Sequence, residues 1–512
     1  MCGILEVARG VRGLPVSVPR LAWGLALPTR LKTGMATTRR EFLSLGIAAG
    51  TLGCGRSGSG PWNVVWIIAD DLSPDLSCYG SSEVSTPNID RLAAEGARFT
   101  NAYVTCPVCS PSRSALITGM YQTSIGAHGH RSHRDDGYSL PEPVRLITDY
   151  FREVGYYTVN DHESGLGGRN KTDFNFQHGK PFEGTDWRER EPGQPFYAHV
   201  NIFEPHRGRP PDAWSFTEGI EDPTDPDSVK APSYYPDDEV SRRDWAGYLD
   251  AVRILDEKVG RVLDRIEEDG LADRTAVIFF GDHGRPMPRD KQFLYDGGIR
   301  VPLIIRWPGQ IEPGTVRDEL VSSIDLSATS LAIAGIDVPE HIEGRVFLGE
   351  GKMPDREYVF AARDRCDETV DRIRAVRDRR YKYIRNYHPE RPYMQLNRYK
   401  EVSYPIWRQM LRLEKAGAIS AEDYPFLART RPEEELYDTV EDPNELRNLA
   451  GSAEHQQVLT RMASTLDLWI RHTGDQGEVS EDPAVAASWE ERMAATYPEA
   501  YAVLEEREEP WK

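Results

Sequence analysis

The sequence predicts an α/β protein with a large, mostly parallel β-sheet sandwiched by helices and a smaller C-terminal domain built on an antiparallel sheet. Two apolar runs, residues 62–69 and 275–281, lie far apart in the chain, and acidic residues follow each of them. Such runs are typical of buried parallel strands whose carboxyl ends carry polar groups. Between the two runs, apolar segments alternate with stretches of helical periodicity. This alternation favours a parallel sheet with its site beyond the carboxyl ends of the strands.

The remaining elements of the first sheet follow in chain order. Residues 86–92 begin with Thr-Pro and predict a helix, because proline suits the first helical turn. Residues 196–203 form an apolar run that predicts another strand. The stretch 209–238 is rich in Pro, Asp and Ser, which predicts a long surface loop. Residues 245–268 carry apolar side chains at helical spacing and predict a helix, and residues 301–307 predict one more strand.

The pattern changes beyond about residue 345, where short segments with polar faces predict strands at residues 358–361, 374–377 and 382–385. We expect these strands to form the smaller, antiparallel sheet. The expected organisation is a leader at 1–60, a catalytic domain at 61–345 and a smaller C-terminal domain at 346–512.

The N-terminal region predicts export. Arg39 and Arg40 precede an apolar stretch at residues 45–52, the pattern of a twin-arginine signal for a periplasmic or other extracytoplasmic protein. The stretch is far shorter than the roughly 20 apolar residues that span a membrane, and no later segment is long enough either. We expect translation to begin at Met35. Cys54 is a candidate for a lipid anchor, and the alternative is ordinary cleavage nearby that releases a soluble protein.

The composition narrows the range of partners. A formal net charge of −20 argues against nucleic-acid binding, because phosphate neutralisation needs a basic surface, so an anionic substrate must meet a local basic pocket. Four cysteines after the leader do not make a disulfide scaffold. Cys106 and Cys109 form a C-x-x-C pattern, but Pro107 interrupts it and no second pair follows, which weakens both a redox and a zinc interpretation.

One short motif places a thiol and a guanidinium four positions apart. Cys109-Ser110-Pro111-Ser112-Arg113 precedes an apolar, helix-compatible stretch. At a helix N-terminus, unpaired backbone N–H groups and the helix dipole stabilise negative charge, and Arg113 acts in the same direction. The motif therefore predicts an anion site. The alternative is a half-buried cysteine in a Pro/Ser turn that opens a helix.

Acidic residues follow two predicted strands. Asp70 and Asp71 come after the first, and Asp282 and His283 after the second, so a parallel sheet brings them to one edge. Three carboxylates gathered without a cation repel one another. Their oxygen ligands favour calcium or magnesium, and one imidazole admits manganese or zinc. The alternative is a pair of helix N-caps in solvated turns.

Further polar residues are weaker candidates. Lys291 and His206 are candidate partners for an oxyanion and a leaving group, although each alone is more often an ordinary surface residue. A loop with three histidines and two arginines follows the Cys109 motif and suits an anionic sugar, with a solvated polar loop as the alternative. Its members are His128, His130, Arg131, His133 and Arg134.

Together these residues resemble the sulfatase family within the alkaline phosphatase superfamily. The family signature is Cys or Ser, any residue, Pro, any residue, Arg, and then a Leu-x-Thr-Gly stretch, which residues 109–119 match throughout. The resemblance covers nearly the whole mature chain. It includes the Asp-Asp pair, the Asp-His-Gly motif at 282–284 and the segments 295–302, 434–438 and 442–443. It implies an alkaline phosphatase-like fold.

The resemblance also implies a mechanism. In that family a separate maturation enzyme oxidises the signature cysteine to formylglycine, whose hydrate is the nucleophile. Carried over by position, Cys109 becomes formylglycine, and a divalent metal, expected to be Ca²⁺ with Mn²⁺ or Mg²⁺ as alternatives, is held there. The implied metal ligands are Asp70, Asp71, Cys109, Asp282 and His283. Arg113 and Lys291 stabilise the nucleophile and the sulfuryl oxygens, and His206 protonates the departing group.

Two departures and one closer likeness refine these expectations. Many sulfatases have Asp-Asn where this chain has Asp-His at 282–283, which leaves the metal identity open. The usual Gly-Lys-x-His segment is absent, and its lysine role is assigned to Lys171. The likeness is greatest to heparan N-sulfatases, which favours a sulfated glycan and, more narrowly, N-sulfoglucosamine, with His133, Glu204 and Arg207 as substrate-binding residues. The alternatives are a phosphonate or phosphate ester hydrolase and an inactive glycan-binding surface protein.

Overall fold

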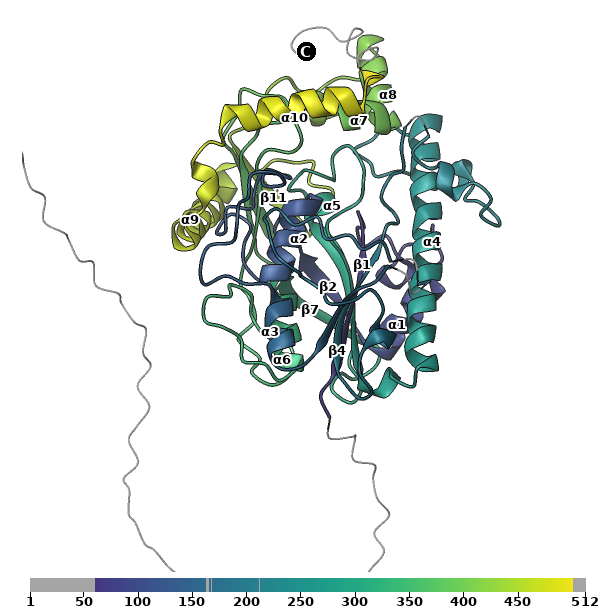
Figure 1. The fold of residues 1–512 in the computed structure, drawn as a ribbon. Coiled ribbons are helices and arrows are strands. Elements are labelled where there is room, and N and C mark those ends of the chain that lie inside the picture. Colours follow the sequence, from purple (N-terminus) through teal and green to yellow (C-terminus); the bar gives the residue numbers. More distant parts are fainter. Residues whose placement is uncertain (1–59, 163–164, 167, 211, 501–512) are drawn as a thin grey trace, which may run out of the picture. The chain divides into compact units, whose positions relative to one another are not determined.

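A computed structural model describes residues 60–500 except 163–164, 167 and 211 (Figure 1). The predicted twin-arginine signal and the candidate lipidation site at Cys54 lie outside the described residues. Within the described part of the chain, no helix has the length and apolar character needed to cross a bilayer.

The main sheet has seven strands in the order β3-β4-β1-β5-β6-β2-β7. β3, β4, β1 and β5 run parallel, whereas β6 runs antiparallel to both β5 and β2. The predicted large and mostly parallel sheet is therefore confirmed. Its strands are β1 Asn63–Ala69, β2 Ala97–Tyr103, β3 Tyr157–Asn160, β4 Phe196–Ile202, β5 Thr275–Gly281, β6 Arg300–Arg306 and β7 Thr315–Ser322.

Helices cover both faces of this sheet, as Figure 1 shows, with α1 and α4 on one face and α2, α3 and α6 on the other. Every residue of β1 and β5 is buried, which explains their uninterrupted apolar sequence. The long α4 is capped by Asp238, whose side chain accepts a hydrogen bond from the Ser241 amide. The helices are α1 Pro87–Glu95, α2 Cys109–Thr118, α3 Ile147–Glu153, α4 Glu239–Glu268, α5 Asp296–Ile299 and α6 Ile324–Ile333.

A second, antiparallel sheet follows in the order β11-β10-β9-β8, and the prediction of such a sheet is confirmed. Helix α9 packs against β9 and β10. The domain boundary near residue 345 stays a prediction. The elements are β8 Val359–Arg363, β9 Ile373–Arg377, β10 Tyr381–Asn386, α7 Arg398–Ser403, α8 Pro405–Lys415, β11 Glu434–Asp438, α9 Gln456–Thr473 and α10 Pro483–Thr496.

Candidate active site

One edge of the main sheet holds four of the five predicted metal ligands, Asp70, Asp71, Asp282 and His283. β1 and β5 are hydrogen-bonded neighbours and pair in register up to Ala69 and Gly281, so the residues that follow them emerge side by side. The backbone amide of Asp71 donates to Asp282 Oδ1 at 3.0 Å, and His283 Nε2 lies 3.0 Å from Asp71 Oδ1. All four side chains are at most 3 % exposed. The alternative of N-caps in solvated turns is therefore wrong.

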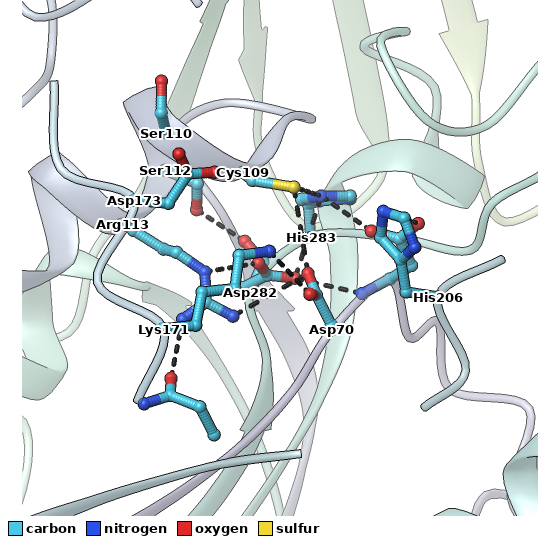
Figure 2. A network of polar contacts seen from close by, with 12 residues as sticks. Asp70, Cys109, Ser110, Ser112, Arg113, Lys171, Asp173, His206, Asp282 and His283 are labelled. Atoms are coloured by element: carbon cyan, nitrogen blue, oxygen red, sulfur yellow. Dashed lines mark hydrogen bonds and ion pairs between the residues drawn. The ribbon is translucent and has the colours of Figure 1, made fainter. Parts of the chain in front are cut away.

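The thiol of Cys109 lies against this cluster, as Figure 2 shows. α2 begins at Cys109 after an extended Val108, and the Sγ atom is 3.8 Å from Asp70 Oδ1 and 3.2 Å from His283 Nε2. Cys109 is fully buried rather than half-buried, so the alternative of an ordinary turn cysteine is also wrong. The geometry places position 109 within reach of the carboxylates and at the positive end of a helix.

Arg113 follows Cys109 by one helical turn and shares its face of α2. Its Nε donates to Asp282 Oδ2 at 2.8 Å and its Nη1 donates to Asn201 Oδ1 at 2.6 Å. These two partners fix the plane of the guanidinium while Nη2 lies 3.7 Å from Asp70 Oδ1, where it has no hydrogen bond. One buried donor therefore remains available beside the thiol.

Two lysines bring further positive charge to the cluster. Lys171 Nζ donates to Asp70 Oδ2 at 2.6 Å, and Lys291 Nζ donates to Asp71 Oδ2 at 2.7 Å. Burial opposes the charged form of Lys291, but Asp71 raises the pKa of Lys291 well above its ordinary value. Conversely, burial raises the pKa of Asp70, yet Lys171 and Arg113 hold it well below the usual range. Both acids thus carry full negative charge at neutral pH.

His206 lies on the side of the cluster that reaches solvent. Its Nε2 is 3.9 Å from Asp71 Oδ2, and its side chain is 22 % exposed. Its Nδ1 is 2.7 Å from the carbonyl oxygen of Arg207, which only accepts hydrogen bonds, so Nδ1 carries a proton. Burial and the charge of Lys291 lower the pKa of His206 to about 4. Nε2 is therefore the nitrogen free to gain or lose a proton at the site.

The structure does not bring the three expected substrate-binding residues into this cluster. Arg207 is 1 % exposed and binds both carboxylate oxygens of Asp244, at 2.7 and 2.8 Å. Glu204 is buried against Lys258, with 2.7 Å between Oε2 and Nζ. His133 lies 3.0 Å from the carbonyl oxygen of Gly126 and is part-buried. Each of these side chains has a partner within the fold, and their role in substrate binding stays a prediction.

The C-x-x-C pattern forms neither a disulfide nor a metal half-site. Cys106 lies in a small buried apolar cluster with Val108 and Cys366, and the four cysteines among the described residues are free. Burial raises the pKa of the Cys106 thiol well above its usual value, so it stays protonated. Cys109 contacts the acid cluster instead.

The donor set fits a divalent cation. One ligand atom from each of Asp70, Cys109, Asp282 and His283 lies within 4.8 Å of the other three. Burial and the charge of Asp70 raise the pKa of Asp282. The positive charges of Arg113 and Lys171 therefore do not fully offset the cost of a negative charge at Asp282. This group has two carboxylates, one imidazole and the side chain of residue 109, and Asp71 Oδ1 brings a third carboxylate to within 3.0 Å of the imidazole. Oxygen and imidazole ligands match the preferences of hard or borderline divalent ions.

Sequence reasoning missed two polar residues near the nucleophile. Asn201, near the end of β4, holds Arg113, and nothing in its local pattern distinguishes it from other strand residues. Asp173 is almost fully buried and pairs with Arg131, at 3.2 Å, and with Arg134. Arg131 in turn donates its backbone amide to Ser110 Oγ at 2.9 Å, which ties the histidine-rich loop to the nucleophile helix.

Comparison with known proteins gives the family. The profile of the family named Sulfatase matches residues 62–189 and 182–336, more than half of the chain. The chain belongs to the sulfatase family. A second profile, "N-sulphoglucosamine sulphohydrolase, C-terminal", matches residues 281–402. The sulfatase is therefore an enzyme of the alkaline phosphatase superfamily that hydrolyses sulfate esters, as the signature at residues 109–119 predicts.

Similar proteins span most of this sulfatase. An ulvan-active sulfatase of Formosa agariphila is 34% identical over 83% of this chain and 78% of its own length. Human N-sulphoglucosamine sulphohydrolase is 28% identical over 81% of this chain and 91% of its own. A solved structure described as a complex with D-glucosamine-2-N,6-O-disulfate has a TM-score of 0.57 at 19% identity and covers 81% of this chain and 99% of its own. That likeness confirms the predicted fold.

Proposed function

We propose that this sulfatase removes sulfate from a sulfated glycan, using formylglycine made from Cys109 by a separate maturation enzyme together with a divalent cation. The observation that carries the proposal is the position of residue 109, which lies at a helix N-terminus 3.8 Å from Asp70 and 3.2 Å from His283. The names of the similar proteins, which refer to ulvan and to N-sulphoglucosamine, support a glycan substrate. We further propose export through the twin-arginine signal at residues 38–52.

The cation would be held by Asp70, Asp71, Asp282 and His283, and three carboxylates favour Ca²⁺. When bound, it would supply Lewis-acid polarisation and neutralise the buried negative charge. The hydrate of formylglycine supplies the oxygen nucleophile that a thiol does not.

Three cationic side chains provide the binding energy for a sulfuryl group. Arg113 is held by hydrogen bonds to Asp282 and Asn201. Lys171 donates a hydrogen bond to Asp70, and Lys291 donates one to Asp71. Donors fixed in a buried site stabilise developing negative charge without reorganisation at the moment of reaction. We propose that Arg113 and Lys291 bind the oxygens on sulfur and that Lys171 binds the same sulfuryl group from the side that faces solvent.

His206 is assigned to the departing atom, which is oxygen in a sulfate ester and nitrogen in a sulfamate such as N-sulfoglucosamine. Its Nδ1–H is fixed by the Arg207 carbonyl, which leaves Nε2 to hold the proton that the leaving group takes. In the free protein the imidazole is neutral at pH 7, because burial and Lys291 lower its pKa to about 4. A sulfate anion bound beside Nε2 favours the protonated form, so substrate binding itself charges the acid.

The substrate class can be tested by a panel that measures released sulfate directly. N-sulfoglucosamine is the narrower proposal, supported by the C-terminal profile, and ulvan oligosaccharides are the competing class. We expect turnover of at least one of these and a higher kcat/KM on it than on a phosphonate monoester of similar size. Faster hydrolysis of the phosphonate than of every sulfated sugar would overturn the proposal.

Calcium is expected to raise the thermal unfolding midpoint of the wild type, because a ligand that binds only the folded state stabilises that state. At a hundredfold excess of calcium over Kd, the free energy of unfolding rises by about 2.7 kcal/mol. Burial disfavours the charged form of His283, but Asp282 and Asp71 raise its pKa well above the usual value. A metal must displace that proton, so the shift should be larger at pH 8 than at pH 5.5.

The matched variants for this measurement are Asp282→Asn, which removes the negative charge of a proposed ligand, and Asp318→Asn, which changes an exposed acid paired with Arg379. Differential scanning calorimetry with and without calcium should show the shift in Asp318→Asn and not in Asp282→Asn. An equal shift in both variants contradicts the assigned site.

A further inference from the structure

The C-terminal helix α10 runs across the end of the main sheet at which the acid cluster lies (Figure 1). The solvent-facing side of that cluster is marked by three partly exposed side chains. Lys171, His206 and Arg131 are 24, 22 and 29 % exposed, whereas the carboxylates beneath them are buried. α10 therefore borders the end of the sheet at which these side chains are exposed (Figure 1).

α10 and the residues before it are anchored on both sides of this region. On the nucleophile side, Arg492 contacts Asp135 at 2.8 Å, and Glu481 bonds to Ser132 in the histidine-rich loop. On the opposite side, Glu490 lies 3.6 Å from Arg398, the first residue of α7. The C-terminal segment thus contacts both the histidine-rich loop and α7, which lie far apart in the sequence.

Tyr399, the next residue of α7, faces the reaction centre. Its ring stacks on His206, with centroids 6.4 Å apart and planes at 30°, and Lys291 Nζ lies 5.6 Å from its centroid. Its hydroxyl is buried but has no hydrogen-bond partner among the described residues. A buried hydroxyl without a partner is costly, so a ligand that offers it a hydrogen bond is bound more favourably.

Tyr497 directly follows α10 and meets Tyr399, with ring centroids 6.0 Å apart and planes at 51°. Burial and the charge of Asp367 raise the pKa of Tyr497, whereas the charges of Lys291 and Arg131 lower it. Tyr399 thus contacts both the histidine assigned to the leaving group and the ring of Tyr497.

We propose that Tyr399 and Tyr497 form the subsite for the sugar ring that leaves when sulfate is removed. The apolar face of a pyranose packs on aromatic rings, and the free Tyr399 hydroxyl supplies a hydrogen bond to a sugar hydroxyl. The inference rests on the proposed function, since it names the part of the substrate that this site holds. It assigns substrate specificity to two residues that lie far along the sequence from the signature and the metal ligands.

Steady-state kinetics on N-sulfoglucosamine and on ulvan oligosaccharides test the subsite. Tyr399→Leu and Tyr497→Ala are each expected to raise KM for the saccharide that the wild type hydrolyses by about tenfold, because stacking on an aromatic ring is lost. Tyr399→Phe keeps the ring and loses only the hydroxyl, so it should raise KM by a smaller factor. Tyr497 is half-buried and lies after the helix, so Tyr497→Ala is the variant with the smallest expected effect on folding.

Tyr358→Ala is the matched control, because this tyrosine packs on Arg461, which belongs to α9, and should leave both constants unchanged. Unchanged KM in Tyr399→Leu and Tyr497→Ala, or a fall in kcat alone, overturns the subsite while wild-type activity upholds the proposed function. A wild type that releases no sulfate from any saccharide overturns both. Near-ultraviolet circular dichroism of each variant verifies that the fold is retained.

Discussion

Replacing Cys109 with alanine is expected to abolish sulfate release while the fold is retained. Cys109 is the first residue of α2, and its side chain lies against the carboxylate cluster. Alanine at this position can be neither oxidised nor hydrated, so it provides no nucleophile. Free sulfate is measured by ion chromatography on the best saccharide of the panel. The thermal midpoint should change little, because the substitution removes a single buried sulfur atom.

Cys106→Ala is the matched control for this experiment. Cys106 is equally buried, belongs to the same C-x-x-C pattern and packs with Val108 and Cys366 rather than with the acids. It should keep most of its activity even if its thermal midpoint falls. Substantial turnover by Cys109→Ala would instead mean that another group attacks sulfur.

Replacing His206 with glutamine is expected to lower kcat on a sugar sulfate by about 10²–10⁴-fold, the usual contribution of a positioned acid. Glutamine keeps a polar group of similar size beside Asp71 but cannot transfer a proton. The loss should be much smaller on an aryl sulfate, because a phenolate, whose conjugate acid has a pKa of about 10, departs without protonation. The ratio of the two losses therefore reports proton transfer rather than binding.

His341→Gln is the matched control for this substitution. His341 lies 3.5 Å from the Tyr150 hydroxyl and makes no described contact with the acid cluster, so both substrates should be hydrolysed at the wild-type rate. Equal losses on the sugar and the aryl substrate in His206→Gln would assign this histidine to positioning and leave the acid to another group.

The parts of the fold that were predictable are those in which the local pattern and the burial agree. β1 and β5 are buried along their whole length, so their sequences read as continuous apolar runs followed by acids. β7 begins with the half-exposed residues 315–318 and has no such run. The direction of β6 was not predictable, because a strand of apolar residues reads the same in a parallel and an antiparallel pair.

The site residues that could be placed from the sequence are those that directly follow a predictable strand. Asp70 and Asp282 were predictable because each directly follows a readable strand, and register then brings them together. Glu204 and Arg207 looked equally suitable in sequence. Their partners, Lys258 and Asp244, lie on α4, and only the packing of that helix reveals that both side chains are occupied. Long-range pairing of this kind leaves no local signal.

The mass of the peptide that contains residue 109 provides the decisive measurement. We expect this peptide, from protein made together with a maturation enzyme or purified from its native host, to be about 18 Da lighter than the cysteine form, since an oxygen replaces a sulfur and two hydrogens. Peptides containing Cys78 and Cys366 serve as internal standards and should keep their full mass. An unmodified thiol at residue 109 in active enzyme would show that formylglycine is not the nucleophile, and an unmodified thiol in inactive protein from the native host would favour a protein that only binds sulfated glycan.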